Sequence, residues 1–149
     1  MTKLYKKYRE PDSKLVVDTF LEDREKLCAR FRDRAEDVHC GRNREVFLMR
    51  GYVVKIPLNH CGIADNDWEG SVSNCEDYPQ SDWQVQYART RMVYVNDIPV
   101  VFMERVEYVT GKEIVQRLGH EPNWTGCVDG GQVGFNRSGR LVAFDYGIR

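Results

Sequence analysis

The sequence lacks the features that would direct a chain into a membrane or the secretory pathway. No apolar run approaches the roughly 18–20 residues that a membrane span requires. The N-terminal stretch MTKLYKKYREPD has no apolar core of the kind that signal peptides contain. The five cysteines are irregularly spaced and do not form the pattern of a disulfide framework. We therefore expect a cytoplasmic protein with reduced thiols and no membrane partner.

The sequence also lacks an excess of charge of one sign. It contains 22 Lys and Arg residues and 23 Asp and Glu residues, for a net charge of −1. General electrostatic attraction to nucleic acid is therefore not predicted, and a nucleic-acid groove lined by the basic termini with Arg89, Arg91 and Arg105 is a minority alternative. Internal repeats and low-complexity segments are absent. The 149 residues, 42% of them hydrophobic, predict a single domain, residues 1–149, with a substantial core.

The first part of the chain, residues 1–40, is expected to form a basic arm and one long helix. Asp12 or Ser13 offers an N-cap, and Gly41 offers a C-cap after a helix that ends near Val38. The apolar residues that recur at helical spacing are Val16, Val17, Phe20, Leu21, Leu27, Phe31, Ala35 and Val38.

The middle of the chain changes to a β pattern. Strands are predicted at 45–49 and 52–56 around Arg50-Gly51, and at 91–95 and 99–103 around the turn Asn96-Asp97. The stretch 58–67, with Gly62 as a breaker, is expected to be a loop that leads into a short helix near Asp65–Glu69. Glu104–Val106 is expected to continue the last strand.

The last part is predicted to contain a helix and a closing hairpin. Thr110 can cap a helix over 111–118 that Gly119 ends, and a hairpin follows between 133 and 144. Together these patterns predict an α+β domain with a long N-terminal helix, an antiparallel sheet and a terminal β-hairpin.

Two acids lie at the ends of the closing hairpin. Asp129 precedes its first strand and Asp145 follows its second, with Gln132 nearby. Carboxylate and amide oxygens are suited to Mg²⁺ and, through it, to a phosphate tail. The alternative is a hairpin with polar tips and no ligand.

Lys55 is unusual because it lies within an apolar, β-branched strand. Lysines are rarely fully buried without a partner, so Lys55 either faces solvent or is held by an anion.

Several of these residues together resemble the protein-kinase-like fold, in the reduced form carried by many bacteriophages. The resemblance runs from about Gly41 to Gly147 and rests on Val53-Val54-Lys55-Ile56, on Glu69, on the strand Pro99–Val106, and on Asp129–Gln132 with Asp145-Tyr146-Gly147. It divides the chain into the N-terminal arm and helix (1–40), a small-lobe-like sheet (41–106) and a remnant large lobe with the hairpin (107–149).

The resemblance implies a role for each matching residue. Lys55 would bind the phosphates of ATP and Glu69 would orient it, while main-chain groups from Glu104 to Val106 would hold the adenine. Asp145 and Gln132 would hold Mg²⁺, and Asp129 would be the catalytic base.

The sequence departs from the family pattern in three places. Gly41-Arg42-Asn43-Arg44, where the phosphate-covering loop would begin, holds one glycine rather than three. Asp129 lies three residues before Gln132, whereas the kinase loop spaces its Asp and Asn five apart. The sequence ends two residues after Gly147, so the resemblance implies a truncated large lobe.

We therefore expect a truncated, phage-encoded, kinase-like protein that acts without catalysis as a binding protein for ATP and Mg²⁺, a host protein, or both. One alternative is an active small kinase or phosphotransferase with Asp129 as base. Another is an interaction module that binds no nucleotide. The pairs His39-Cys40 and His60-Cys61 leave a zinc site as a minor further alternative. Cys28 and Cys127 are expected to be small buried hydrophobes.

Overall fold

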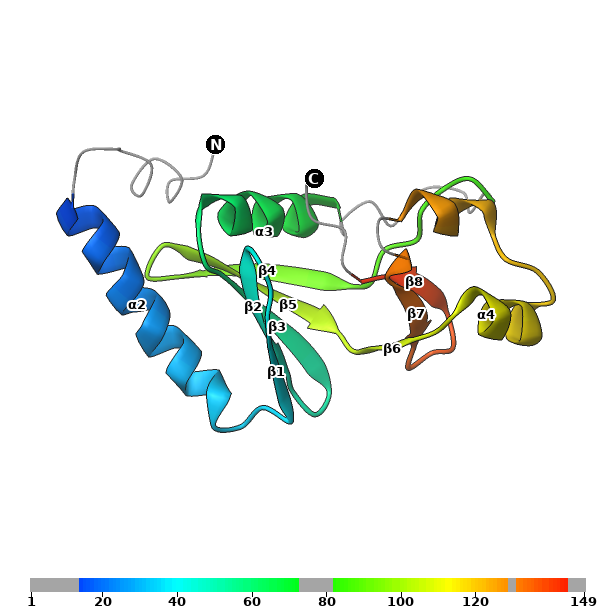
Figure 1. The fold of residues 1–149 in the computed structure, drawn as a ribbon, viewed down its shortest axis with the longest axis horizontal. Coiled ribbons are helices and arrows are strands. Elements are labelled where there is room, and N and C mark those ends of the chain that lie inside the picture. The colour runs from blue at the N-terminus through cyan, green and yellow to red at the C-terminus, as the bar shows by residue number, and fades with distance from the viewer. Residues whose placement is uncertain (1–13, 73–81, 129–130, 145–149) are drawn as a thin grey trace.

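The computed structural model of the chain describes residues 14–72, 82–128 and 131–144 and confirms an α+β fold. Figure 1 shows a larger sheet with helices α2 and α3 toward one end of the molecule, and a smaller sheet with helix α4 toward the other. The elements are α2 (Lys14–Arg32), β1 (Asp37–Cys40), β2 (Arg44–Leu48), β3 (Tyr52–Pro57), α3 (His60–Val72), β4 (Thr90–Val95), β5 (Ile98–Glu104), β6 (Val106–Tyr108), α4 (Gly111–Leu118), the 3₁₀ helix η1 (Asn123–Cys127), β7 (Val133–Asn136) and β8 (Leu141–Ala143).

The larger sheet has five strands in the order β1-β2-β3-β5-β4, and every neighbouring pair is antiparallel. The predicted hairpin between β4 and β5 is confirmed. Its two turn residues, Asn96 and Asp97, have φ values of 49° and 64°, which is the left-handed geometry of a tight two-residue hairpin. Both residue types tolerate that geometry, so the sequence specifies this turn locally.

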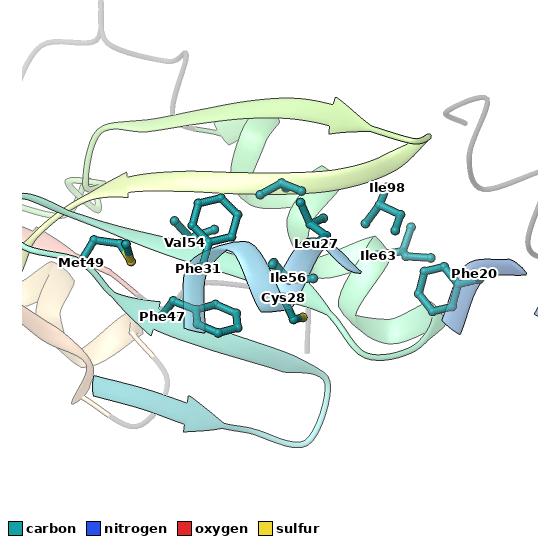
Figure 2. Close-up of a cluster of buried hydrophobic side chains, with 11 residues drawn as sticks. Phe20, Leu27, Cys28, Phe31, Phe47, Met49, Val54, Ile56, Ile63 and Ile98 are labelled. Carbon is teal, nitrogen blue, oxygen red and sulfur yellow. The ribbon is translucent and has the colours of Figure 1, made fainter. Parts of the chain in front are cut away.

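One face of the larger sheet forms the main core with α2 (Figure 2). Side chains alternate along a strand, so Phe47 of β2, Val54 and Ile56 of β3, and Ile98 and Val100 of β5 lie on this same face. From α2, the helix face that carries Phe20, Leu27, Cys28 and Phe31 packs against them. Burying side chains of this size contributes about 1.5–3 kcal/mol each, so this layer is the main source of stability.

The N-terminal helix is shorter than predicted. It ends at Arg32, and residues 37–40, expected to be helix, form strand β1 beside β2. The Phe31 carbonyl accepts from the N–H groups of Arg34 and Ala35 to close the helix, and Glu36 N–H then donates to the Leu48 carbonyl. Gly41 does not cap the helix, because its N–H closes the β1–β2 turn on Arg44. Pairing with β2 therefore overrides the helical spacing of Ala35 and Val38.

Helix α3 is longer than predicted and begins within the stretch that was expected to be a loop. Asn59 supplies the N-cap, because its side-chain oxygen accepts from Gly62 N–H at 3.0 Å. Gly62 is needed for close packing, since a Cβ at this position would lie 2.0 Å from the Asn43 carbonyl oxygen. The prediction was wrong because it took this glycine for a breaker.

The smaller sheet has three antiparallel strands in the order β6-β7-β8. The terminal hairpin of β7 and β8 is as predicted, but Glu104–Val106 is not one continuous strand. Strand β5 ends at Glu104, and Val106 begins β6 in the other sheet. A second core lies here and contains Val109, Ile114, Trp124, Val128, Val133, Phe135, Leu141 and Ala143.

Helix α4 is confirmed with both of its predicted ends. Thr110 and Glu113 form a capping box, and Gly119 takes a left-handed conformation (φ 82°) that returns its N–H to the Val115 carbonyl. Across the described ranges, we find no helix that combines the length and apolarity needed to cross a bilayer.

Candidate functional site

A cavity of about 730 Å³ lies against the second face of the larger sheet, where the smaller sheet approaches it. Its walls come from the β1–β2 turn, from β2, β3 and the β5–β6 connection, and from the end of β8. The apolar part is formed by Val46, Leu48, Val53, Met103, Val106 and Phe144. The polar part includes Arg42, Asn43, Arg44, Lys55, Asp65 and Gln132.

The alternation of the strands explains why this cavity exists. Residues 44, 46 and 48 of β2 and residues 53 and 55 of β3 point away from the α2 core, and Met103 of β5 joins them. Val53, Val101 and Met103 also pack with Val142 of the smaller sheet, so the two sheets are joined beside the cavity by apolar contacts.

Lys55 is held by a buried carboxylate. Its Nζ lies 3.2 and 3.1 Å from the two Glu69 oxygens, and the exposed fractions of the two side chains are 4% and 0%. Charged side chains are buried at acceptable cost only when they are paired and hydrogen-bonded, which this geometry provides. The structure therefore brings together the lysine and the glutamate that the resemblance paired.

Helix α3 aims Glu69 at Lys55 through a second buried side chain, Asn66. The Asn66 amide donates to the carbonyl oxygens of Lys55 (3.0 Å) and Pro99 (2.8 Å). These bonds tie the helix to β3 and β5. Since Glu69 lies three residues further along the helix, it projects from the same face, toward the sheet.

Arg44 is a third charged member of this cluster, and its place there was not predicted from the sequence. Its Nη1 lies 2.9 Å from Glu69 Oε1 and 3.2 Å from Asn66 Oδ1, and the side chain is 8% exposed. The strand period could have identified it, because residue 44 lies on the same face of β2 as Val46, and Val46 is opposite Lys55.

Lys55 also contacts the segment after the terminal hairpin. Its Nζ donates to the Phe144 carbonyl at 2.6 Å, and Phe144 N–H donates to the Gln132 carbonyl at 3.1 Å. Gln132 and Phe144 both line the cavity. The other two predicted acids, Asp129 and Asp145, lie outside the described residues.

The β1–β2 turn is bound to the start of α3. Leu58 N–H donates to the Asn43 carbonyl at 2.7 Å, and Asn59 Nδ2 donates to the Arg42 carbonyl at 3.3 Å. The Asn43 amide donates to Asp65 Oδ2 at 3.4 Å. These bonds fix the turn at the polar end of the cavity.

Glu104 lines the cavity at the β5–β6 connection but also has a structural role that was not predicted. Its carboxylate accepts from Arg89 N–H at 2.8 Å and from the Asn136 amide at 3.3 Å. The Glu104 N–H donates to the Arg89 carbonyl. The Glu104 N–H is therefore already hydrogen-bonded within the protein. Val106, the other residue predicted to contact the adenine, lines the cavity from the start of β6.

The two His-Cys pairs do not combine into a metal site. Within 14–72, 82–128 and 131–144, no three His, Cys, Asp or Glu side chains are grouped so that they could hold a metal ion. The zinc alternative, which depends on residues 39, 40, 60 and 61, is therefore wrong.

Comparison of the sequence with known protein families found no matching family, and comparison with curated proteins found no significant match.

Proposed function

We propose that the protein binds ATP with Mg²⁺ in the cavity between its sheets, as a kinase-like binding protein without catalysis of its own. The observation that carries this proposal is the buried Lys55–Glu69 pair at the cavity. In protein kinases a lysine of the third strand pairs with a glutamate of the neighbouring helix and contacts the ATP phosphates. Here Lys55 belongs to β3 and Glu69 to α3, the next element along the chain.

The chemistry of the cavity supports a ligand with one flat apolar end and one anionic end. Lys55 is opposite Val101 of β5, so Glu104 lies three residues further along that strand, about 10 Å away. Met103, Val106 and the apolar wall suit a base at that end, and Lys55 suits its phosphates. Concave, mostly apolar sites with a few convergent polar groups are typical of small-molecule binding.

Two observations favour binding over phosphoryl transfer. The β1–β2 turn contains one glycine, and the carbonyls of Arg42 and Asn43 are bonded to the start of α3, so the turn is not a glycine-rich cover for phosphates. Asp129, the predicted base, is also closer in sequence to Gln132 than the kinase loop requires. An active phosphotransferase that uses Asp129, a module without nucleotide, a phage origin and a host-protein partner stay predictions.

The test is thermal melting of the protein with and without Mg-ATP. A ligand that binds only the folded state at 100 times its Kd adds about 2.7 kcal/mol of stability, which raises the melting temperature of a domain this size by several degrees. We expect this rise in the wild type and in the control Lys112→Ala, which alters an exposed lysine of α4. In Lys55→Ala the rise should be lost.

Three further measurements separate the alternatives. Circular dichroism of Lys55→Ala must show a folded protein before the loss is assigned to the site. Absence of any rise in the wild type at saturating Mg-ATP would refute nucleotide binding and leave the interaction module. Phosphate release or transfer with turnover, lost in Asp129→Ala, would replace the non-catalytic proposal with the phosphotransferase. A rise that needs Mg²⁺ and is lost in Asp145→Ala would support the predicted metal ligand.

A further inference from the structure

We infer that Arg44 and Lys55 form a two-cation clamp for the polyphosphate end of the ligand. Arg44 would bind the phosphates that backbone N–H groups bind in a glycine-rich loop. This inference rests on the proposed nucleotide site, but it assigns phosphate binding to a residue that the kinase resemblance did not include.

The register of the sheet places the two cations side by side. Lys55 is directly opposite Val46, so Arg44, two residues earlier on the same face of β2, is its diagonal neighbour. Diagonal neighbours in antiparallel strands lie about 7–8 Å apart, within reach of long side chains. Arg44 Nη1 and Lys55 Nζ accordingly meet at one carboxylate, with Glu69 Oε1 lying 2.9 Å from the first and 3.2 Å from the second.

The arrangement presents the cations, rather than the carboxylate, to the cavity. Arg44 and Lys55 both line it, whereas Glu69 is fully buried behind them on α3. One carboxylate shared by the two cations orients both side chains. Such preorganised cations are suited to an anion that carries several charges.

The charged residues along the cavity wall also favour the end with Arg44 and Lys55 as the place for the phosphates. Arg42, Arg44 and Lys55 lie at this end, and Asp65 is the acid that accompanies them among the described lining residues. The other lining acid is Glu104. Glu104 is opposite Tyr52 of β3, and Arg44 is opposite Pro57 of the same strand. Because Tyr52 and Pro57 are five residues apart, Glu104 and Arg44 are separated by about 16 Å along the strand direction.

The main chain of the β1–β2 turn differs from a glycine-rich loop, which binds phosphate through several backbone N–H groups. Gly41 N–H donates to the Arg44 carbonyl, and the turn is bonded to α3 through the carbonyls of Arg42 and Asn43. A planar guanidinium, which can donate two parallel hydrogen bonds to phosphate oxygens, supplies an alternative from the first residue of β2.

The test compares three probes on the wild type and on Arg44 variants by isothermal titration calorimetry: Mg-ATP, inorganic tripolyphosphate and adenosine. We expect Arg44→Gln to weaken ATP and tripolyphosphate by about tenfold or more, because a charge-assisted hydrogen bond is lost, and to leave adenosine unchanged. Arg44→Lys keeps the charge without the fork and should be intermediate. Arg50→Gln, at an exposed arginine of the β2–β3 turn, is the matched control and should bind as the wild type does.

The outcomes distinguish this inference from the proposed function. If Arg44→Gln binds ATP as tightly as the wild type, the clamp is refuted and the nucleotide site remains. If the wild type binds tripolyphosphate but neither ATP nor adenosine, the clamp is supported and the nucleotide proposal fails. If the wild type binds none of the three probes, both fail.

A measurement on the wild type covers the case in which Arg44 variants do not fold. Tripolyphosphate should slow modification of Arg44 by phenylglyoxal, read by mass spectrometry, and leave that of Arg50 unchanged. Equal modification of Arg44 with and without saturating tripolyphosphate would refute the clamp.

Discussion

Cys28 lies on the buried face of α2, among the side chains that pack against the larger sheet (Figure 2). Burial, the largest cause, and the nearby Glu45 carboxylate together raise the pKa of its thiol from 9.0 to about 12, while Arg24 opposes the change. Cys28 was predicted to be a small buried hydrophobe, and that is confirmed. The same prediction for Cys127 is wrong, since that side chain is exposed at the end of η1.

The raised pKa of Cys28 predicts a loss of stability in alkaline solution. The folded protein keeps this thiol protonated up to about pH 12, whereas the unfolded chain ionises it near pH 9. Its contribution is therefore complete below pH 9 and is lost as pH rises toward 12. Urea unfolding at pH 9 and 10.5 should show a fall about 2 kcal/mol larger in the wild type than in Cys28→Ala.

The control for this prediction is Cys40→Ala, which removes an exposed thiol and should follow the wild type. An equal fall in Cys28→Ala and the wild type would show that other groups account for the alkaline loss.

Among the elements, α3 and the β1–β2 turn approach each other closely at Gly62. Gly62 meets the Asn43 carbonyl so directly that a Cβ would lie 2.0 Å from that oxygen. Alanine normally favours a helix over glycine by up to about 1 kcal/mol, so Gly62→Ala should stabilise the helix if space allowed. We expect instead a loss of about 1–3 kcal/mol, because α3 must move away from the turn.

Chemical denaturation of Gly62→Ala beside Gly51→Ala would measure this effect. A Cβ at Gly51 meets nothing within 4 Å, so this control should change the free energy of unfolding by no more than about 0.5 kcal/mol. A neutral or stabilising Gly62→Ala would mean that helix and turn are not rigidly joined.

The sequence predicted the elements that local patterns specify and missed those that depend on distant partners. The capped helix after Thr110 and the hairpins at Asn96-Asp97 and 136–139 carry their own turn and cap residues. Strand β1 could not be found this way, because its residues continue a helical pattern and become a strand only by pairing with β2. The early start of α3 required recognising Asn59 as a cap.

The candidate site was predictable in part for a similar reason. Lys55 stood out as a charge in an apolar strand, and the resemblance supplied Glu69 as its partner. Arg44 gave no such signal, since an arginine next to a turn is normally exposed, and only the strand register and the fold show it buried beside Lys55.

At the scale of the whole molecule, polar contacts at the β5–β6 connection join the two sheets. Glu104 binds the Asn136 amide of β7 and the Arg89 N–H. Its neighbour Arg105 donates to the Met49 carbonyl in the β2–β3 turn and pairs with Glu36, the residue before β1. The cavity depends on these contacts, because its walls belong to both sheets.

Glu104→Ala should therefore loosen the smaller sheet against the larger one. It leaves the Asn136 amide and the Arg89 N–H without this acceptor, which costs about 1–3 kcal/mol. Hydrogen exchange by NMR should show faster exchange at the Arg89 amide. Glu107→Ala, which changes an exposed glutamate of β6, is the matched control and should exchange as the wild type does. Unchanged Arg89 exchange in Glu104→Ala would show that apolar contacts alone hold the sheets together.

The alternation of β2, β3 and β5 between core and cavity has a consequence for how this chain can evolve. Val54 and Ile56 belong to the core and Lys55 between them lines the cavity, so under the proposed function neighbouring codons would come under different selection. Substitutions can change one property and spare the other. A single-codon insertion or deletion within β3 would exchange the two faces and remove both at once. Length changes should therefore accumulate in the turns, and ligand preference should drift through every second position of these strands.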